Sequence, residues 1–141
     1  MRQAPLFLLL VFTSLAWPEE VTIESIKDLQ WKNRIILISA GEASEEWIYR
    51  LGESKAEIVD RDIVWIALWG SSYRSNLAAS ISEKLVDEIQ SRYFENETTR
   101  MVLIGKDGGV KDASNRLNLS ELFALIDGMP MRRAEIRSRS N

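Results

Sequence analysis

The chain has 141 residues and a net charge of −3, with 45% hydrophobic and 28% charged residues, a composition typical of one folded domain. It contains no cysteine and no histidine, which excludes thiol peroxidase and disulfide-exchange chemistry, Ser-His-Asp triads and three-histidine zinc sites. Any enzyme reaction of this chain would have to use carboxylate, Lys, Tyr or Arg side chains.

Residues 1–16 have the pattern of a cleaved secretory signal peptide. Arg2 precedes an apolar run from Leu6 to Leu15, and small residues stand at the two positions that signal peptidase recognises, Ser14 and Ala16. The run is short for a bilayer span, and the alternative is an uncleaved amphipathic or buried N-terminal segment. We therefore expect an exported protein, periplasmic or secreted, with no membrane association after cleavage.

The first half of the remaining chain predicts a strand, a helix and a second strand. Residues 34–40, "RIILISA", are apolar at nearly every position, as in a strand covered on both faces. A helix should begin at Ser44 and be weakened at Gly52, and residues 60–68, "DRDIVWIAL", end in a second buried strand. This order predicts a right-handed βαβ unit with parallel strands.

A polar loop and a third predicted helix follow. Residues 69–76, "WGSSYRSN", are interpreted as the loop, and apolar residues recur at helical spacing over 78–93. Ser80 and Glu83 match a capping box, so the regular part of this helix is expected to start there.

The C-terminal part predicts a β-hairpin and a last core helix. Lys-Asp-Gly-Gly interrupts the apolar run of residues 100–112, "RMVLIGKDGGVKD", as in a hairpin turn. Asn118 is the expected cap of the last core helix, which should stop at Gly128 and Pro130. Residues 131–141 are expected to form a basic tail or helix.

The element order is βαβ, helix, β-hairpin, helix. It predicts an α/β protein with a thioredoxin-like domain over residues 17–130, in which helices cover both faces of a sheet in a three-layer α/β/α arrangement.

Four segments carry a resemblance to a known family: "WKNRIILI" (31–38), "DRDIVWI" (60–66), "RMVLIGKDGGVK" (100–111) and "LFALIDGMPMRRAEIR" (122–137). With these segments the chain resembles domain-of-unknown-function family 4174. This family is thioredoxin-like and peroxiredoxin-related, and occurs in small exported bacterial proteins and in vertebrate sushi-repeat and coiled-coil-domain extracellular proteins. The last two segments are the most specific.

A more distant resemblance is to catalytic peroxiredoxins, which place Pro-x-x-x-Thr-x-x-Cys after the first core strand and an Arg just before a later strand. The first motif falls on residues 40–47, with Ser44 at the Thr position and Trp47 at the Cys position, and the second falls on Arg100. Because Trp47 replaces the nucleophile and Ala40 replaces the proline, the resemblance does not imply peroxide reduction.

The turn that this resemblance singles out is the first candidate site. Ser44, Glu42 and a converging Arg100 could form a small polar pocket that binds an anion or a peptide, beside Trp47. The preferred interpretation is structural: the carboxylates complement a helix N-terminus and Trp47 fills core volume. Adjacent carboxylates at a helix start suit neither glycoside hydrolysis nor calcium, so we expect no metal and no cofactor.

Two further features invite a binding interpretation. Residues 129–141 carry a net charge of +3, so Arg132, Arg133 and Arg137 could dock an acidic partner, although a solvated helix end is the preferred interpretation. Trp31 and Trp69 flank predicted strand ends, where exposed aromatics can anchor a partner, and core packing is again preferred.

The residues favour an exported, non-catalytic domain that acts as a binding or structural module for an unknown protein or a small anionic ligand. Nucleic acid is not expected, because the chain is acidic outside its tail, and the sequence specifies no oligomeric state. The alternative is a redox-related, peroxiredoxin-like enzyme that uses an external thiol or a cofactor near Ser44 and Arg100.

Overall fold

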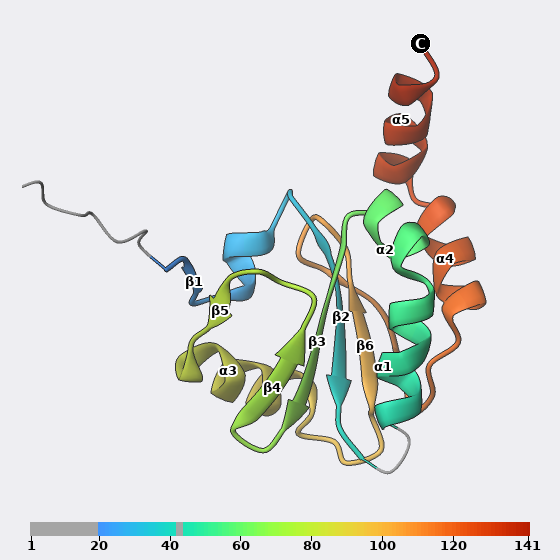
Figure 1. Ribbon diagram of the computed structural model, residues 1–141. Coiled ribbons are helices and arrows are strands. Elements are labelled where there is room, and N and C mark those ends of the chain that lie inside the picture. Colours follow the sequence, from blue (N-terminus) through green and yellow to red (C-terminus); the bar gives the residue numbers. More distant parts are fainter. Residues whose placement is uncertain (1–19, 42–43) are drawn as a thin grey trace, which may run out of the picture.

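The computed structural model describes residues 20–41 and 44–141, so the predicted signal peptide and Glu42 lie outside the described residues. The protein is built on a five-stranded sheet with the order β4-β3-β2-β6-β7 (Figure 1). The strands are β2 (Arg34–Ser39), β3 (Ile63–Trp69), β4 (Ser72–Ser75), β6 (Met101–Ile104) and β7 (Val110–Ser114). The helices are α1 (Ser44–Glu53), α2 (Lys55–Asp60), α3 (Glu83–Tyr93), α4 (Leu119–Asp127) and α5 (Pro130–Arg139). A 3-10 helix spans Ile26–Leu29, and β1 (Thr22–Ile23) pairs with β5 (Ser80–Ile81) in a small parallel sheet.

Helices cover both faces of the sheet, because the central strand is apolar on both faces. Ile35 and Leu37 of β2 belong to one core cluster, which also contains buried residues of α3 and the 3-10 helix. Ile36 and Ile38 belong to the other, with residues of α1, α2 and α4. Figure 1 shows α1, α2 and α4 together on one side of the sheet and α3 on the other. The three-layer α/β/α prediction is therefore confirmed.

The predicted strand pairings are also found. β2 and β3 are parallel from Arg34 opposite Ile63 to Ser39 opposite Leu68, as expected for a βαβ unit. β6 is antiparallel to β2 and to β7, so the predicted hairpin is present. Its turn is closed by the Gly105 N–H, which donates to Gly109 O at 2.9 Å, and Gly108 takes a positive φ of 83°. The helix after β2 is interrupted at Ser54, two residues after Gly52, and continues as α2.

The predicted loop at residues 69–76 is wrong, because it contains β4, an edge strand antiparallel to β3. Gly70, with a φ of 57°, makes the reversal between the two strands. Every second residue of β4 is exposed and three of its four residues are polar, which hides the strand signal. Tyr73 packs on the α3 side of the core, and its hydroxyl accepts a hydrogen bond of 2.8 Å from the Ile81 N–H.

The predicted capping residue of α3 is also wrong. Ser80 and Ile81 form β5, since Ile81 is buried opposite Ile23 of β1. Ser82 caps the helix instead, with its hydroxyl accepting from the Leu85 N–H at 3.2 Å. Ser80 and Ser82 both precede Glu83, and the pairing of Ser80 with Thr22 of β1 excludes Ser80 as the cap.

The side chain of Asn76 extends the hydrogen bonding of β3 beyond the end of β4. Its Oδ1 accepts from the Trp65 N–H at 2.8 Å, and its Nδ2 donates to Ile63 O at 3.0 Å. These are the backbone groups that a longer β4 would have paired.

Residues 130–139 form helix α5, which extends beyond the sheet in Figure 1 and is joined to it by ion pairs. Glu135 accepts from Nη1 and Nη2 of Arg34 at 3.2 Å each and from Lys106 Nζ at 2.7 Å. Lys106 also binds Asp62 at 2.8 Å, and Arg34 donates to Arg61 O at 2.9 Å. Burial works to raise the pKa of Glu135, but the hydrogen bonds from Lys106 and Arg34 outweigh it and leave that pKa below its ordinary value.

A second set of ion pairs is centred on Arg132. Its guanidinium contacts the Asp60 carboxylate and lies 3.2 Å from Oδ1 of Asp127, which also binds Arg61 at 2.7 Å. The hydrogen bond from Arg132 lowers the pKa of Asp60, and the one from Arg61 lowers the pKa of Asp127. Arg139 completes the set with a 2.7 Å contact to Asp60. The basic C-terminal segment is thus tied to the start of β2, the end of α2 and the end of α4.

Within residues 20–41 and 44–141, no helix has the length and apolar character needed to cross a membrane.

Candidate functional site

The turn singled out by the sequence lies between β2 and α1, at the lower end of the sheet in Figure 1. The Gly41 N–H donates to Oγ of Ser44, and the Ser44 N–H donates back to Gly41 O at 3.0 Å. Ser44 is only 2% exposed. Its buried hydroxyl therefore links the two ends of the turn by accepting from the Gly41 N–H.

Arg100 is the residue before β6, and its side chain extends to this turn. Its Nε donates to Ser39 O at 3.1 Å, at the end of β2. A Cβ placed on Gly41 would lie 1.5 Å from Nη2 of Arg100, so the guanidinium rests directly on the glycine backbone. Ser44 and Arg100 thus both contact Gly41, and the absence of a side chain there makes room for the guanidinium. Within the described parts of the chain, the two terminal nitrogens of Arg100 have no hydrogen-bond acceptor.

The other side chains near the start of α1 are used structurally. Trp47 is partly buried and packs against the core cluster on the α1 and α4 side. Glu45 accepts from Arg74 of β4 at 3.1 Å, and Glu46 pairs with Arg50 one turn later. The sequence pattern missed Arg74 because its strand was interpreted as a loop.

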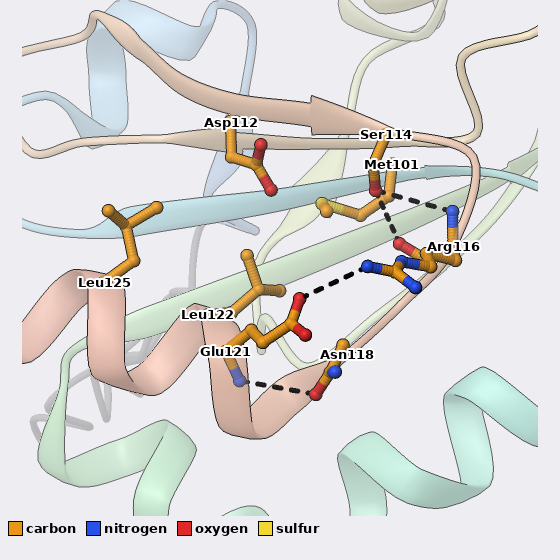
Figure 2. A pocket seen from close by; sticks show the side chains of 8 residues that line it. All are labelled: Met101, Asp112, Ser114, Arg116, Asn118, Glu121, Leu122 and Leu125. Carbon is orange, nitrogen blue, oxygen red and sulfur yellow. Dashed lines mark hydrogen bonds and ion pairs between the residues drawn. The ribbon is translucent and has the colours of Figure 1, made fainter.

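A cavity of about 270 Å³ lies between β7 and α4. Met101, the residue after Arg100, lies in its wall opposite Ser114, whose carbonyl accepts from the Arg100 N–H at 2.9 Å. Figure 2 shows the apolar side chains of Leu122 and Leu125 pointing toward Met101 and Asp112 across this space.

Four of the five polar residues that line this cavity, Ser114, Arg116, Asn118 and Glu121, already have a hydrogen-bond or ion-pair partner. Oγ of Ser114 donates to Arg116 O at 2.6 Å, and Asn118 caps α4 by accepting from the Glu121 N–H at 3.3 Å. The Arg116 and Glu121 side chains form a loose ion pair of 3.7 Å (Figure 2). The cavity combines an apolar wall with a solvent-exposed charge pair, and the structure places no nucleophile with an adjacent base in it.

Over residues 20–41 and 44–141, the acidic side chains form no group that would hold a metal ion. The basic residues of α5 divide into two kinds. Arg133 and Arg137 are exposed, whereas Arg132 is buried by its ion pairs with Asp60 and Asp127, so Arg132 is not part of an open docking surface.

Trp31 is exposed, whereas the sequence favoured packing in the core. Its side chain is 63% exposed, and its φ is 66°, an unusual conformation for a bulky residue. The Trp31 N–H donates to Lys106 O at 2.6 Å, so the residue lies beside the hairpin turn.

Comparison with models of protein families shows to which family the chain belongs. The family model described as domain of unknown function DUF4174 matches residues 25–135, from the cap of the 3-10 helix to Glu135. The chain belongs to the DUF4174 family. The match includes the candidate turn, Arg100 and most of α5, so the ion pairs of Glu135 and Arg132 lie within the DUF4174 domain.

Among solved structures, this DUF4174 domain is similar to the reduced 2-Cys peroxiredoxin of Plasmodium vivax. The TM-score is 0.54 at 14% sequence identity, over 78% of this chain and 83% of the peroxiredoxin chain. The similarity shows a thioredoxin-like fold shared with a peroxiredoxin, in a DUF4174 domain that has no cysteine. A search of curated proteins found no match.

Proposed function

We propose that this DUF4174 domain is an exported, non-catalytic binding module that holds an anionic group of a small ligand or partner protein at the Gly41–Ser44 turn. The observation that carries the proposal is the position of Arg100. Its Nε donates to Ser39 O and its guanidinium lies against Gly41, while Nη1 and Nη2 have no acceptor among the described residues. An arginine held in one orientation presents a planar pair of donors to a carboxylate or phosphate.

The side chains around Arg100 favour binding over catalysis. Ser44 is buried and its hydroxyl is engaged by Gly41, and Trp47 contributes to the core. No cysteine is available for a thiol reaction. A redox reaction on this scaffold would therefore depend wholly on an external thiol or cofactor, and the arginine would supply only charge stabilisation.

The binding proposal is tested with inorganic phosphate as the probe. We expect saturable shifts of the Gly41 amide and of the Arg100 Nε–H in NMR spectra, lost in Arg100→Gln and retained in Arg116→Gln. The second variant removes the same charge from a more exposed arginine that does not contact the turn. Equal weakening in both variants, or a loss of binding that follows a fall in Tm, would refute the proposal.

Two measurements test the remaining parts. N-terminal sequencing of the protein from the exported fraction of its own cells should show a chain that begins at Trp17, and an uncleaved cytoplasmic chain would contradict export. Peroxide consumption with a low-molecular-weight thiol should not exceed the buffer rate. Turnover that is lost in Arg100→Gln would favour the peroxiredoxin-like alternative.

A further inference from the structure

The cavity between β7 and α4 lies along an open edge of the sheet. Within the described parts of the chain, β7 is the last strand of the sheet and pairs only with β6. The Ser114 carbonyl faces β6, because it accepts from the Arg100 N–H. Backbone groups of successive residues in a strand point to opposite sides, so the N–H and C=O of Ala113 face away from the sheet. No backbone group of residues 20–41 and 44–141 is hydrogen-bonded to them there.

The cavity extends along this edge. The chain runs from Asp112 of β7 to Arg116 and then returns along α4 to Leu125. Figure 2 accordingly shows Asp112 and Leu125 at one end of the space and Arg116 and Asn118 at the other. An extended segment that lies beside β7 would therefore place every second side chain over the space between β7 and α4.

Asp112 is the polar residue of this lining that has no partner. The ion pair beside it joins Arg116 to Glu121. Lys111, the preceding residue, pairs with Asp107 at 2.7 Å. Over the described parts of the chain, no lysine or arginine forms an ion pair with Asp112 and no donor is hydrogen-bonded to it. Figure 2 shows its carboxylate directed into the cavity, so the unpaired charge that a ligand meets there is negative.

Leu125 provides an apolar surface at the same end of the cavity. Its side chain is 43% exposed, whereas Leu122 and Met101, deeper in the lining, are 2% and 1% exposed. A lysine side chain suits this combination, because its four-carbon stem can cover apolar surface while its ammonium group binds a carboxylate. The volume of about 270 Å³ exceeds the roughly 150 Å³ that accommodates benzene, so one lysine side chain fits.

We propose that this cavity and the edge of β7 bind an extended, lysine-containing peptide segment of a partner protein. The segment adds to the sheet as a strand beside β7, and its lysine side chain covers Leu125 and reaches Asp112. The backbone of Ala113 supplies hydrogen bonds that do not depend on the peptide sequence, and Asp112 supplies the selectivity for a cation. A basic segment is favoured over an acidic one because Arg116 already has Glu121 as its partner, whereas Asp112 has none.

The test is an NMR titration of the full mature chain with the capped pentapeptide Thr-Val-Lys-Val-Thr. We expect saturable shifts of the Ala113 amide and of the methyl groups of Leu122 and Leu125. The same peptide with glutamine in place of lysine should bind about tenfold more weakly. The lysine peptide N-methylated at its three central residues should not saturate, because it cannot donate to a strand edge. An unmoved Ala113 amide, or equal affinities of the lysine and glutamine peptides, would overturn the proposal.

Asp112→Asn and Asp87→Asn are a matched pair of variants. Both remove one carboxylate charge, and Asp87 is an exposed residue of α3 on the other face of the sheet. We expect Asp112→Asn to weaken binding of the lysine peptide by about tenfold and Asp87→Asn to leave it nearly unchanged. Asp112→Lys should reverse the preference, so that a peptide with glutamate in place of lysine binds better than the lysine peptide.

Equal effects of the two asparagine variants would show that only the overall charge matters and would refute the site. Analytical ultracentrifugation gives a second check. A dimer that pairs through β7 and excludes the peptide would also refute the proposal, because a second copy of the chain would then be the occupant of this edge.

Discussion

Replacement of Glu135 by glutamine should strongly destabilise the fold, because this carboxylate is shared by two nearly buried cations. Side-chain exposure is 1% for Arg34 and 9% for Lys106, against 20% for Glu135. Glutamine keeps the shape, removes the charge and turns one of the two acceptor oxygens into a donor that faces a cation. The three hydrogen bonds of 3.2, 3.2 and 2.7 Å cannot all persist.

The magnitude follows from what each cation retains. Removing one partner of a buried ion pair costs about 3–5 kcal/mol. Lys106 keeps Asp62 and Arg34 keeps the carbonyl of Arg61, so we expect the lower end, about 3 kcal/mol of unfolding free energy. For a domain of this size the Tm should fall by about 10 °C.

Urea denaturation at pH 7, followed by tryptophan fluorescence, measures this change. Glu46→Gln is the control, since it removes a charge from an exposed pair with Arg50 and should cost less than about 0.5 kcal/mol. The double variant Arg34→Met, Glu135→Gln should lose less stability than the sum of its two single variants, because the charge left unpaired by glutamine is then absent. A Glu135→Gln variant as stable as the control would refute the reasoning.

Three further predictions concern the turn, helix α1 and the effect of pH. Gly41→Ala should displace the guanidinium of Arg100 and weaken phosphate binding in the NMR titration, at a cost of only about 1 kcal/mol in urea, because the displaced group is the end of a flexible side chain. Unchanged phosphate affinity would contradict the role of this contact. Gly52→Ala has open space for its Cβ and lies within α1, so it should raise the free energy of unfolding by about 0.5–1 kcal/mol; a lower midpoint in urea would contradict this. The pKa values of Asp60 and Asp127 are lowered in the folded state, so their contribution is complete above their unfolded pKa and is lost as the pH falls through the folded value. The Tm should therefore decrease mainly below about pH 4. A Tm that increases as the pH is lowered from about 5 to 3 would contradict the assignment.

The sequence predicted the parts of the fold whose signals are local. Consecutive apolar residues mark β2 and β3 because both faces of these strands are covered, and Asp-Gly marks the hairpin. β4 was missed because a short edge strand with polar residues on its exposed face has the composition of a loop. Arg100 lies next to the Gly41 turn because β6 pairs with β2, and the sequence indicated this position only through the resemblance to peroxiredoxins.

The ion pairs of α5 could not be predicted, because the partners of each charge lie far apart in the sequence. Arg34 and Glu135 are separated by 101 residues, and Arg132 and Asp60 by 72. A charged residue is expected on the surface, so Arg132 was interpreted as part of a solvated basic helix end, with docking to an acidic partner as the alternative. The available signals were a lone glutamate among four arginines and a Pro at a position that both ends one helix and starts the next.

The amide of Asn76 has a consequence for how this protein behaves at high concentration. An open margin of β3 would be a template onto which a strand of another molecule could add. By occupying the N–H of Trp65 and the carbonyl of Ile63, one side chain makes that margin unavailable where β4 has ended. Self-association along β3 would therefore have to begin by displacing this one amide.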